Sequence, residues 1–444
     1  MSENTQELKR VLKFGDLMAS AVGQIIGAGI MSLTGASIAL PGKSTPIAFI
    51  LSTVFVVCSA LPYIFINSTI RTNGGMYTIV SLLVNKKLGG YFTIIGVLGN
   101  LSLAMYALSA ADYLMGLIGF GHRQIIATII LTGFMILNIV GIDAFAKVQN
   151  FMVILLVISL IIFTIAGLPQ VKWGELTAPE TWMTGGITGL LRATTLLTFA
   201  TGGATTVVSL AAEAVNPTHD IPRVIIVSTL GVAVLYAFMS IVAVGVLPLE
   251  QTAGQSLVNT ARTVLPKPLF ILFIVGGAEM ALASTLNNQL ATATKPMLQA
   301  TWDGWFPASW GKLSKFKTPV FYLVVLYVIG MVTIWTGMDI DAIGSLVLIL
   351  GQFTAVFIAY SMTQLPKVIP DEWAKSPFHV NDGTLKFCAF LAFLTCILNF
   401  YLQCLGQPAW VVIGNVAMAA AALIYSFVRY NSGKVTQVVS YEAA

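Results

Sequence analysis

The sequence contains very little charge. Only 9% of its 444 residues are Asp, Glu, Lys or Arg, whereas 57% are hydrophobic. A soluble domain carries roughly 25% charged residues, so a soluble fold of this length could not cover its surface with polar groups. The composition therefore excludes the soluble classes and favours a protein that a lipid bilayer surrounds.

The sequence also lacks the usual signatures of several functions. No GxxxxGK[ST] loop is present, which argues against an ATP-driven pump. The three histidines fall in predicted loops, and no apolar run holds a catalytic constellation, which argues against an intramembrane enzyme. No filter loop or ring of charge indicates a channel. No basic groove indicates a nucleic-acid partner.

The few cysteines follow no metal-binding or disulfide spacing. All four, Cys58, Cys388, Cys396 and Cys404, fall inside apolar runs. In such places cysteine usually packs as a small hydrophobic residue. We therefore expect no metal site and no cofactor.

Apolar runs of about 20 residues recur along the chain, and each is long enough to cross roughly 30 Å of hydrocarbon. Twelve are expected near residues 15–38, 46–67, 90–118, 123–142, 148–168, 190–213, 223–247, 267–294, 319–336, 340–364, 384–404 and 408–429. These runs are too long and too continuous for barrel strands. The sequence therefore predicts an all-α polytopic membrane protein of about 12 transmembrane helices.

The basic residues predict the orientation of these helices. With an even number of helices and both termini in the cytoplasm, 17 of the 23 Lys and Arg residues lie on the cytoplasmic side. This bias follows the positive-inside rule. Residues 1–13 show no cleavable signal, so we expect a multi-pass protein of a prokaryotic inner membrane, with the lipid bilayer as its surroundings.

Two of the runs carry glycines near their middle. The first contains Gly23, Gly27 and Gly29, and the sixth contains Gly202 and Gly203. Glycine weakens a helix interior, and unwound backbone at membrane depth is tolerated only where it is buried or lines a cavity. Paired interruptions in corresponding helices of two halves indicate a transporter binding site. Close helix packing through small residues is the alternative explanation.

Motifs along nearly the whole chain resemble those of the amino acid–polyamine–organocation family, and within it the prokaryotic L-amino acid transporters. The matching segments are Gly23 to Ile30 (G-x-x-x-G-A-G-I), Asn73 to Tyr77 (N-G-G-M-Y), Asn138-x-x-Gly141 with Lys147-Val148-Gln149, Phe199 to Gly203 with Glu213, Asn216-Pro217 and Ile221-Pro222-Arg223, and Asp303-Gly304 with Pro307 and Thr318-Pro319. The proline that precedes the second motif in the family is replaced here by Arg71.

The resemblance implies a five-plus-five inverted repeat with two additional C-terminal helices. The expected division is a cytoplasmic N-terminus at 1–13, a first repeat at 14–168, a second repeat at 190–364, two further helices at 384–429 and a cytoplasmic C-terminus at 430–444. It also implies one central site that opens alternately to each side of the membrane.

Residues at the two interruptions are expected to form that site. The resemblance places the substrate carboxylate on the backbone around Gly27, Ala28 and Gly29, where unpaired N–H groups begin a half-helix. It places the ammonium on carbonyl groups of Ile25, Phe199 and Gly202. Further positions expected near the substrate are the Phe199 ring as an aromatic lid, Thr201, Ala204 and Thr205 beside the side chain, and Asn100 on the pocket wall. Simple packing of Phe199 and an interhelical hydrogen bond of Asn100 are the alternatives.

The ionisable residues inside the apolar runs are candidates for gating or coupling. Asp112 is either functional or simply solvated at the outer end of the third run. Glu279 either accepts a proton or lines a wet vestibule. Glu213 forms an inner gate with Lys295 or Arg223, or is a surface charge.

The coupling mode remains open on sequence grounds. Residues 148–168 contain no lysine, although some relatives carry one there, which disfavours lysine-based proton coupling. Ser284 and Thr285 offer hydroxyl ligands for sodium, and exchange requires no ion at all. We expect a lone polypeptide, without a heavy subunit, that carries a small neutral amino acid. An amine, polyamine or amino-acid derivative is the alternative substrate.

Overall fold

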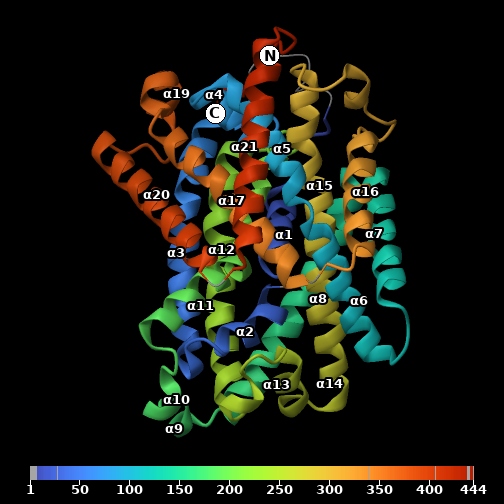
Figure 1. The fold of residues 1–444 in the computed structure, drawn as a ribbon, viewed down its shortest axis with the longest axis vertical. Helices are drawn as coiled ribbons and strands as arrows, with labels where there is room; N and C mark the ends of the chain where they lie inside the picture. The colour runs from blue at the N-terminus through green and yellow to red at the C-terminus, as the bar shows by residue number, and fades with distance from the viewer. Residues whose placement is uncertain (1–7, 28, 339, 406, 438–440, 444) are drawn as a thin grey trace.

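A computed structural model describes residues 8–27, 29–338, 340–405, 407–437 and 441–443. Its long helices run roughly side by side along one axis (Figure 1). The two termini lie at the same end of this bundle, which we call the terminal face, and the short helices α9, α10 and α13 lie at the other end, the opposite face. The fold is that of a polytopic all-α membrane protein, as predicted.

The part of the chain up to residue 170 forms eight α-helices. They are α1 (Phe14–Ile25), α2 (Thr34–Ile38), α3 (Thr45–Thr69), α4 (Met76–Leu83), α5 (Gly89–Gly99), α6 (Ser102–Ile118), α7 (Arg123–Val140) and α8 (Ile142–Gly167), with the π-helix η2 (Gly29–Leu33) and 3-10 turns η3 (Gly42–Ser44), η4 (Lys86–Leu88) and η5 (Leu168–Gln170) between them.

The middle of the chain continues the bundle. Its helices are α9 (Trp173–Leu176), α10 (Pro179–Trp182), α11 (Gly186–Thr201), α12 (Pro217–Gly245), α13 (Leu257–Val264), α14 (Lys267–Leu272) and α15 (Met280–Trp302), with the 3-10 helices η6 (Ala204–Leu210) and η7 (Leu249–Gln251) and the π-helix η8 (Phe273–Glu279).

The last part of the chain packs against the outside of these helices. It comprises η9 (Ala308–Gly311), α16 (Val320–Trp335), α17 (Ile340–Met362), α18 (Leu365–Val368), α19 (Pro370–Lys375), α20 (Asp382–Cys404) and α21 (Ala409–Asn431). The strand β2 (Tyr441–Ala443) then pairs antiparallel with β1 (Ile70–Thr72) at the terminal face.

Ten helical stretches among the described residues are long and apolar enough to cross a membrane. They coincide with ten of the twelve expected runs. The other two expected runs coincide with shorter apolar helices, Val320–Trp335 and Leu346–Met362. The count of twelve transmembrane helices therefore stays a prediction.

The third expected run is not one continuous helix. Its two segments, α5 and α6, meet at Asn100 and Leu101. The Nδ2 group of Asn100 donates a hydrogen bond to the carbonyl of Gly96 at 2.6 Å, which gives the end of α5 a side-chain partner. Asparagine favours such local side-chain bonds to the backbone, which compete with continued helix.

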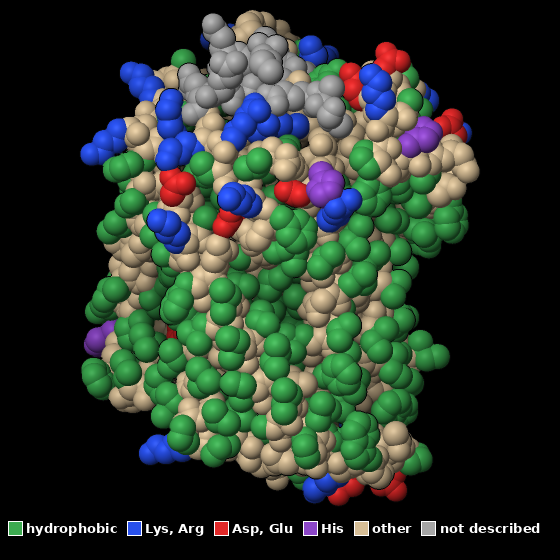
Figure 2. Space-filling view, turned by 180° about the vertical axis from the view of Figure 1, so that it is seen from behind, with side chains coloured by type: hydrophobic (Ala, Val, Ile, Leu, Met, Phe, Trp, Pro, Cys, Tyr) green, Lys and Arg blue, Asp and Glu red, His purple; other side chains and the backbone are tan. Residues whose placement is uncertain are grey.

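The outer surface is apolar where the bundle faces the lipid. Figure 2 shows a broad belt of hydrophobic side chains between rims that carry the charged groups. Ile154 and Ile165 of α8 and Phe387 of α20 are exposed members of this surface. Exposed apolar residues in such number are stable only in contact with lipid, because no comparable patch occurs on soluble monomers.

Prediction for the packing of α5. The helix passes so close to Trp305 and α21 that a Cβ added at Gly90 would lie 2.3 Å from Cζ3 of the Trp305 ring. Because Trp305 is fully buried, Gly90→Ala is expected to destabilise the protein by about 1–3 kcal/mol through overpacking. Thermal unfolding in detergent measures this effect. The control is Gly414→Ala in α21, where an added Cβ meets nothing within 4 Å and stability should be kept. Equal unfolding temperatures for both variants would contradict the packing described.

Candidate functional site

The first predicted interruption is present. The helix α1 ends at Ile25, Ile26 leaves helical geometry with ψ 83°, and helical structure resumes at Gly29 in η2. The N–H of Gly27 turns back to the carbonyl of Ile25 at 3.0 Å. Ala28 lies outside the described residues, so its predicted role in carboxylate binding has no structural description.

The second predicted interruption is also present and lies beside the first. The helix α11 ends at Thr201, and η6 begins only at Ala204. Between them Gly203 has φ +118°, a left-handed backbone conformation that side chains rarely allow. A Cβ there would also lie 2.9 Å from the carbonyl oxygen of Gln24 in α1. The glycine is therefore needed both for the turn and for the contact between the two breaks.

A second close contact joins the two broken helices. A Cβ added at Gly29 would lie 2.5 Å from the Cα of Ala200 and 2.7 Å from its Cβ. The two helix segments on the opposite-face side of the breaks therefore touch backbone to backbone. The next turn is equally tight, since a Cβ at Gly35 would lie 1.7 Å from the carbonyl oxygen of Gln255. These contacts leave no room for a side chain between the helices on the opposite-face side of the breaks.

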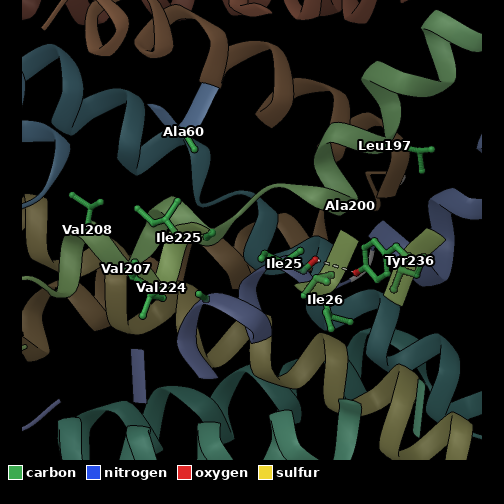
Figure 3. Packing of buried hydrophobic residues seen from close by; sticks show 14 of the residues in the cluster. Ile25, Ile26, Ala60, Leu197, Ala200, Val207, Val208, Val224, Ile225 and Tyr236 are labelled. Carbon is green, nitrogen blue, oxygen red and sulfur yellow. Dashed lines mark hydrogen bonds between the residues drawn. The ribbon is translucent and has the colours of Figure 1, made fainter. Parts of the chain in front are cut away.

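Buried side chains surround the broken segment of α1. Figure 3 shows Ile25 and Ile26 beside Tyr236 of α12, with Ala200 nearby. The hydroxyl of Tyr236 donates to the carbonyl oxygen of Ile25 at 3.4 Å. The Ile25 carbonyl, which the sequence assigned to a substrate ammonium, thus already accepts bonds from Tyr236 and from the N–H of Gly27.

A cavity of about 260 Å³ lies on the terminal-face side of the breaks. Its polar wall comes from α5, η6 and α15, and its apolar wall comes mainly from α5, α15 and α17. The polar residues include Asn100, Thr206, Ser209, Gln289 and Thr292, and the apolar residues include Phe92, Ile95, Met297, Val347 and Leu350. Asn100 lines the cavity and also accepts an interhelical hydrogen bond from Gln289 of α15, so its role at the substrate stays a prediction.

A chain of hydrogen-bonded side-chain amides begins in the polar wall and extends from it to α1. Gln289 donates to Oδ1 of Asn100 at 3.0 Å, and Gln24 donates to Oε1 of Gln289 at 3.3 Å. Asn288 in turn donates to Oε1 of Gln24 at 2.7 Å and to the hydroxyl of Thr206 at 3.3 Å. The chain links α1, the end of α5, η6 and α15, and so connects both broken helices to the cavity wall.

Sequence reasoning missed this amide chain. The signal was present, since Asn287, Asn288 and Gln289 are consecutive amides within a predicted membrane helix. Polar side chains in such helices normally bond across helices because lipid offers no partner. Asn287 follows the same rule on another face, where it bonds Asn138 and Gln149, each at 2.9 Å.

Of the predicted substrate-binding residues that the structure describes, only Asn100 lines the cavity, and the others do not reach its wall. The hydroxyl of Thr201 bonds Ser52 of α3 at 3.3 Å and therefore points to α3 rather than to the cavity. Ala204 is buried, and Thr206 rather than Thr205 lines the cavity. The Phe199 ring packs against the hydrophobic cluster that contains Leu103, Tyr106 and Leu286.

The predicted hydroxyl pair lies against the broken helix. Ser284 and Thr285 both donate to the carbonyl of Gly23, at 3.3 Å and 2.8 Å, and a Cβ at Gly27 would lie 2.5 Å from the Thr285 hydroxyl. These two hydroxyls and one carbonyl are hard oxygen groups gathered at one point. Among the described residues, no group of three His, Cys, Asp or Glu could hold a metal ion.

Glu213 and Lys295 form a buried ion pair near the terminal face. The ammonium of Lys295 lies 2.8 Å from Oε1 of Glu213, and the side chains of Lys295 and Glu213 are 7% and 3% exposed, respectively. The backbone around Glu213 is fixed on both sides, because Val11 and Leu12 donate to its carbonyl and Arg71 donates to the carbonyls of Ala212 and Ala214. Of the alternatives for Glu213, the pair with Lys295 is the one observed.

A second polar cluster lies at the terminal end of the cavity. Tyr77, which lines the cavity, donates to Oδ2 of Asp303 at 2.6 Å, and Gln299 donates to Oδ1 at 3.1 Å. Burial raises the pKa of Asp303 to about 6, although these two hydrogen bonds oppose the shift. Gln437, beyond the last helix, donates to the Tyr77 hydroxyl at 3.1 Å.

The other two acidic candidates differ in their surroundings. Asp112 pairs with Arg123 at 2.7 Å, and its side chain is 46% exposed, in agreement with the solvated alternative. Glu279 ends η8 inside the bundle, and its Oε1 is buried without a hydrogen-bond partner among the described residues. The structure does not bring either residue to the cavity wall.

This combination of features defines the class of the protein. Two broken helices that contact each other and a polar cavity inside a lipid-facing bundle are the architecture of a membrane transporter.

The family follows from comparison with known proteins. The family model described as amino acid permease matches residues 12–432, so the chain belongs to this family and is a transporter, not an enzyme. A branched-chain amino acid permease, BcaP, of Bacillus subtilis is 28% identical over 93% of this chain and 92% of its own length. A methylthioribose transporter of the same organism is 24% identical over 80% and 81%, respectively. The vacuolar cationic amino acid transporter 2 of Arabidopsis thaliana is 24% identical over 82% of this chain and 61% of its own length.

Prediction for the contact between the broken helices. Because the Cα of Ala200 cannot move without its helix, Gly29→Ala is expected to separate η2 from α11 at a cost of about 1–3 kcal/mol. Transport into proteoliposomes should fall sharply if this packing closes the site toward the opposite face. Gly15→Ala in α1 is the matched control, because an added Cβ there meets nothing within 4 Å. Wild-type transport by the Gly29 variant would show that this contact is not required.

Prediction for the buried ion pair. Lys295→Met leaves Glu213 buried and unpaired, which is expected to cost about 3–5 kcal/mol of folding stability. The double variant Glu213→Gln with Lys295→Met removes both charges and is expected to recover most of the unfolding temperature. If the pair closes the terminal face, the double variant will still transport poorly. Full transport by the stable double variant would exclude a gating role.

Proposed function

We propose that the protein carries a small neutral amino acid across the plasma membrane by alternating access. The observation that carries this proposal is the meeting of the two broken helices beside a polar cavity. A zwitterion that leaves water needs substitutes for its hydration, and the ends of half-helices supply unpaired N–H and C=O groups of the right sign. Side-chain charges are then unnecessary.

The backbone offers a place for each end of such a substrate. The start of η2 at Gly29 presents N–H groups to a carboxylate, as the resemblance to the family suggests. The end of α11, with the carbonyls of Phe199 and Gly202, is the corresponding place for an ammonium. Ile25 joins this set if its bond to Tyr236, which is long at 3.4 Å, gives way to the substrate.

The cavity composition supports a neutral substrate. None of the described residues that line it is Asp, Glu, Lys or Arg. A cationic amino acid or a polyamine would lose its hydration there without a carboxylate to replace it. The uncharged cavity therefore suits a neutral substrate, such as the branched-chain amino acids in the name of one relative, better than a cationic amino acid, as in the name of another.

The conformation supports alternating access. The contacts of Gly29 and Gly35 pack the helices tightly on the opposite-face side of the breaks, while the cavity lies on the terminal-face side. We place the terminal face in the cytoplasm, because the sequence concentrates Lys and Arg there. On this assignment we propose that the contacts of Gly29 and Gly35 close the site to the outside and that the Glu213–Lys295 pair acts as an inner gate.

Three coupling modes fit the chain, and each has its own residues. Glu279 is the candidate proton acceptor because it is buried inside the bundle without a hydrogen-bond partner among the described residues for its Oε1. Ser284 and Thr285, with the Gly23 carbonyl, are the candidate sodium ligands. Substrate exchange needs neither group, and we propose it as the basal mode of a protein that acts as a single polypeptide.

Prediction for transport. Purified protein in proteoliposomes is expected to take up a labelled neutral amino acid, and unlabelled amino acid inside should accelerate uptake. Imposed proton and sodium gradients test the other modes, with Glu279→Gln and Ser284→Ala as the matched variants. If a proton gradient stimulates uptake and Glu279→Gln abolishes this stimulation, the protein is a proton symporter and not an exchanger. Failure of every amino acid in the panel to be transported or to exchange would contradict the proposed function.

A further inference from the structure

Three consecutive amides of α15 have different surroundings. Asn287 and Asn288 are fully buried, and their hydrogen bonds hold neighbouring helices together. Gln289 is only partly buried and lines the cavity. A membrane helix gains little from an amide at a surface where leucine would suffice, because the polar group must lose its hydration. Gln289 is thus the amide of this run that both bonds other helices and faces the cavity.

The carboxamide of Gln289 is held in a fixed orientation. Its Nε2 donates to Asn100 at 3.0 Å, and its Oε1 accepts from Gln24 at 3.3 Å. A glutamine side chain has two N–H donors and two acceptor positions, so one donor and one acceptor position remain. Gln24 is itself held by Asn288, which fixes the far end of the chain. The cavity wall therefore presents a preoriented amide with unused hydrogen-bonding capacity.

The wall across the cavity is mostly apolar and includes Phe92, Val347 and Leu350. The hydroxyls of Thr93 and Thr354 also line the cavity, but each donates to a carbonyl of its own helix. A side chain that enters from the breaks thus meets one polar wall and one apolar wall. A short side chain with a hydroxyl or carboxamide group satisfies both. An aliphatic side chain would leave the remaining polar groups of Gln289 without water and without a partner.

We infer that Gln289 is a specificity-determining residue that favours neutral amino acids with a hydroxyl or carboxamide side chain over aliphatic ones of similar shape. Threonine, serine, asparagine and glutamine are the substrates of this class. The inference rests on the proposed function and narrows it, since it assigns a different preference from the one that the name of the branched-chain relatives states. Asn100 and Gln24 act as positioning residues for the Gln289 amide.

Threonine and valine provide the sharpest comparison, because they share a branched shape and differ in one hydroxyl group. Competition against a transported label measures their relative affinity on the wild-type protein, without any variant. We expect threonine to compete about tenfold better than valine, since a site that hydrogen-bonds its ligand discriminates strongly against the analogue without the group. Equal competition, or stronger competition by valine, would overturn the inference.

A variant then assigns the preference to this residue. Gln289→Met keeps the length of the side chain and removes its polar groups, so the threonine-to-valine ratio should fall to about one while valine gains affinity. Thr354→Val is the control, because this hydroxyl lines the same cavity but bonds only the Gly351 carbonyl of its own helix, and the ratio should be kept. An unchanged ratio in Gln289→Met would assign the preference elsewhere and overturn the role of Gln289. If the wild-type protein transports none of the amino acids, that result would instead contradict the proposed function.

Discussion

The structure depends on one requirement, that backbone groups freed inside a membrane must find partners within the protein. Each break in α1–η2 and α11–η6 exposes N–H and C=O groups where lipid could not satisfy them. The two breaks lie against each other inside the bundle, where the contacts Gly29 to Ala200 and Gly203 to Gln24 leave no room for a side chain. The amide chain that starts at Gln24 connects the breaks to the cavity wall. The packing that buries the two breaks therefore also shapes the candidate site.

The polar side chains around the breaks extend this requirement outward. The amides of Gln24, Asn288, Gln289 and Asn100 satisfy one another in a chain, and the buried pair Glu213–Lys295 satisfies the charges near the terminal face. Such groups are costly unless paired, so each link limits how the helices can separate. A transport cycle must exchange these bonds for others rather than simply break them.

Much of the architecture could be predicted from the sequence, because lipid imposes simple rules. Long apolar runs identified the membrane helices, and glycine clusters at Gly27 and Gly202 identified both breaks. The break at Asn100 was not predicted, since a single amide in an apolar run has no periodic signature. The amide chain was missed for a related reason: Gln24 and Gln289 are far apart in sequence, and only folding brings them together. Likewise, the hydroxyl of Thr201 turned to Ser52 of α3, because the rotation of α11 about its axis depends on packing.

The most direct test of the account is an experimental structure of the protein with a transported amino acid bound. The account predicts density for the substrate between the start of η2 and the end of α11, with its side chain directed to the wall that carries Asn100 and Gln289. Density in any other place, with the two breaks empty and still in contact, would contradict the claim that the broken helices form the binding site.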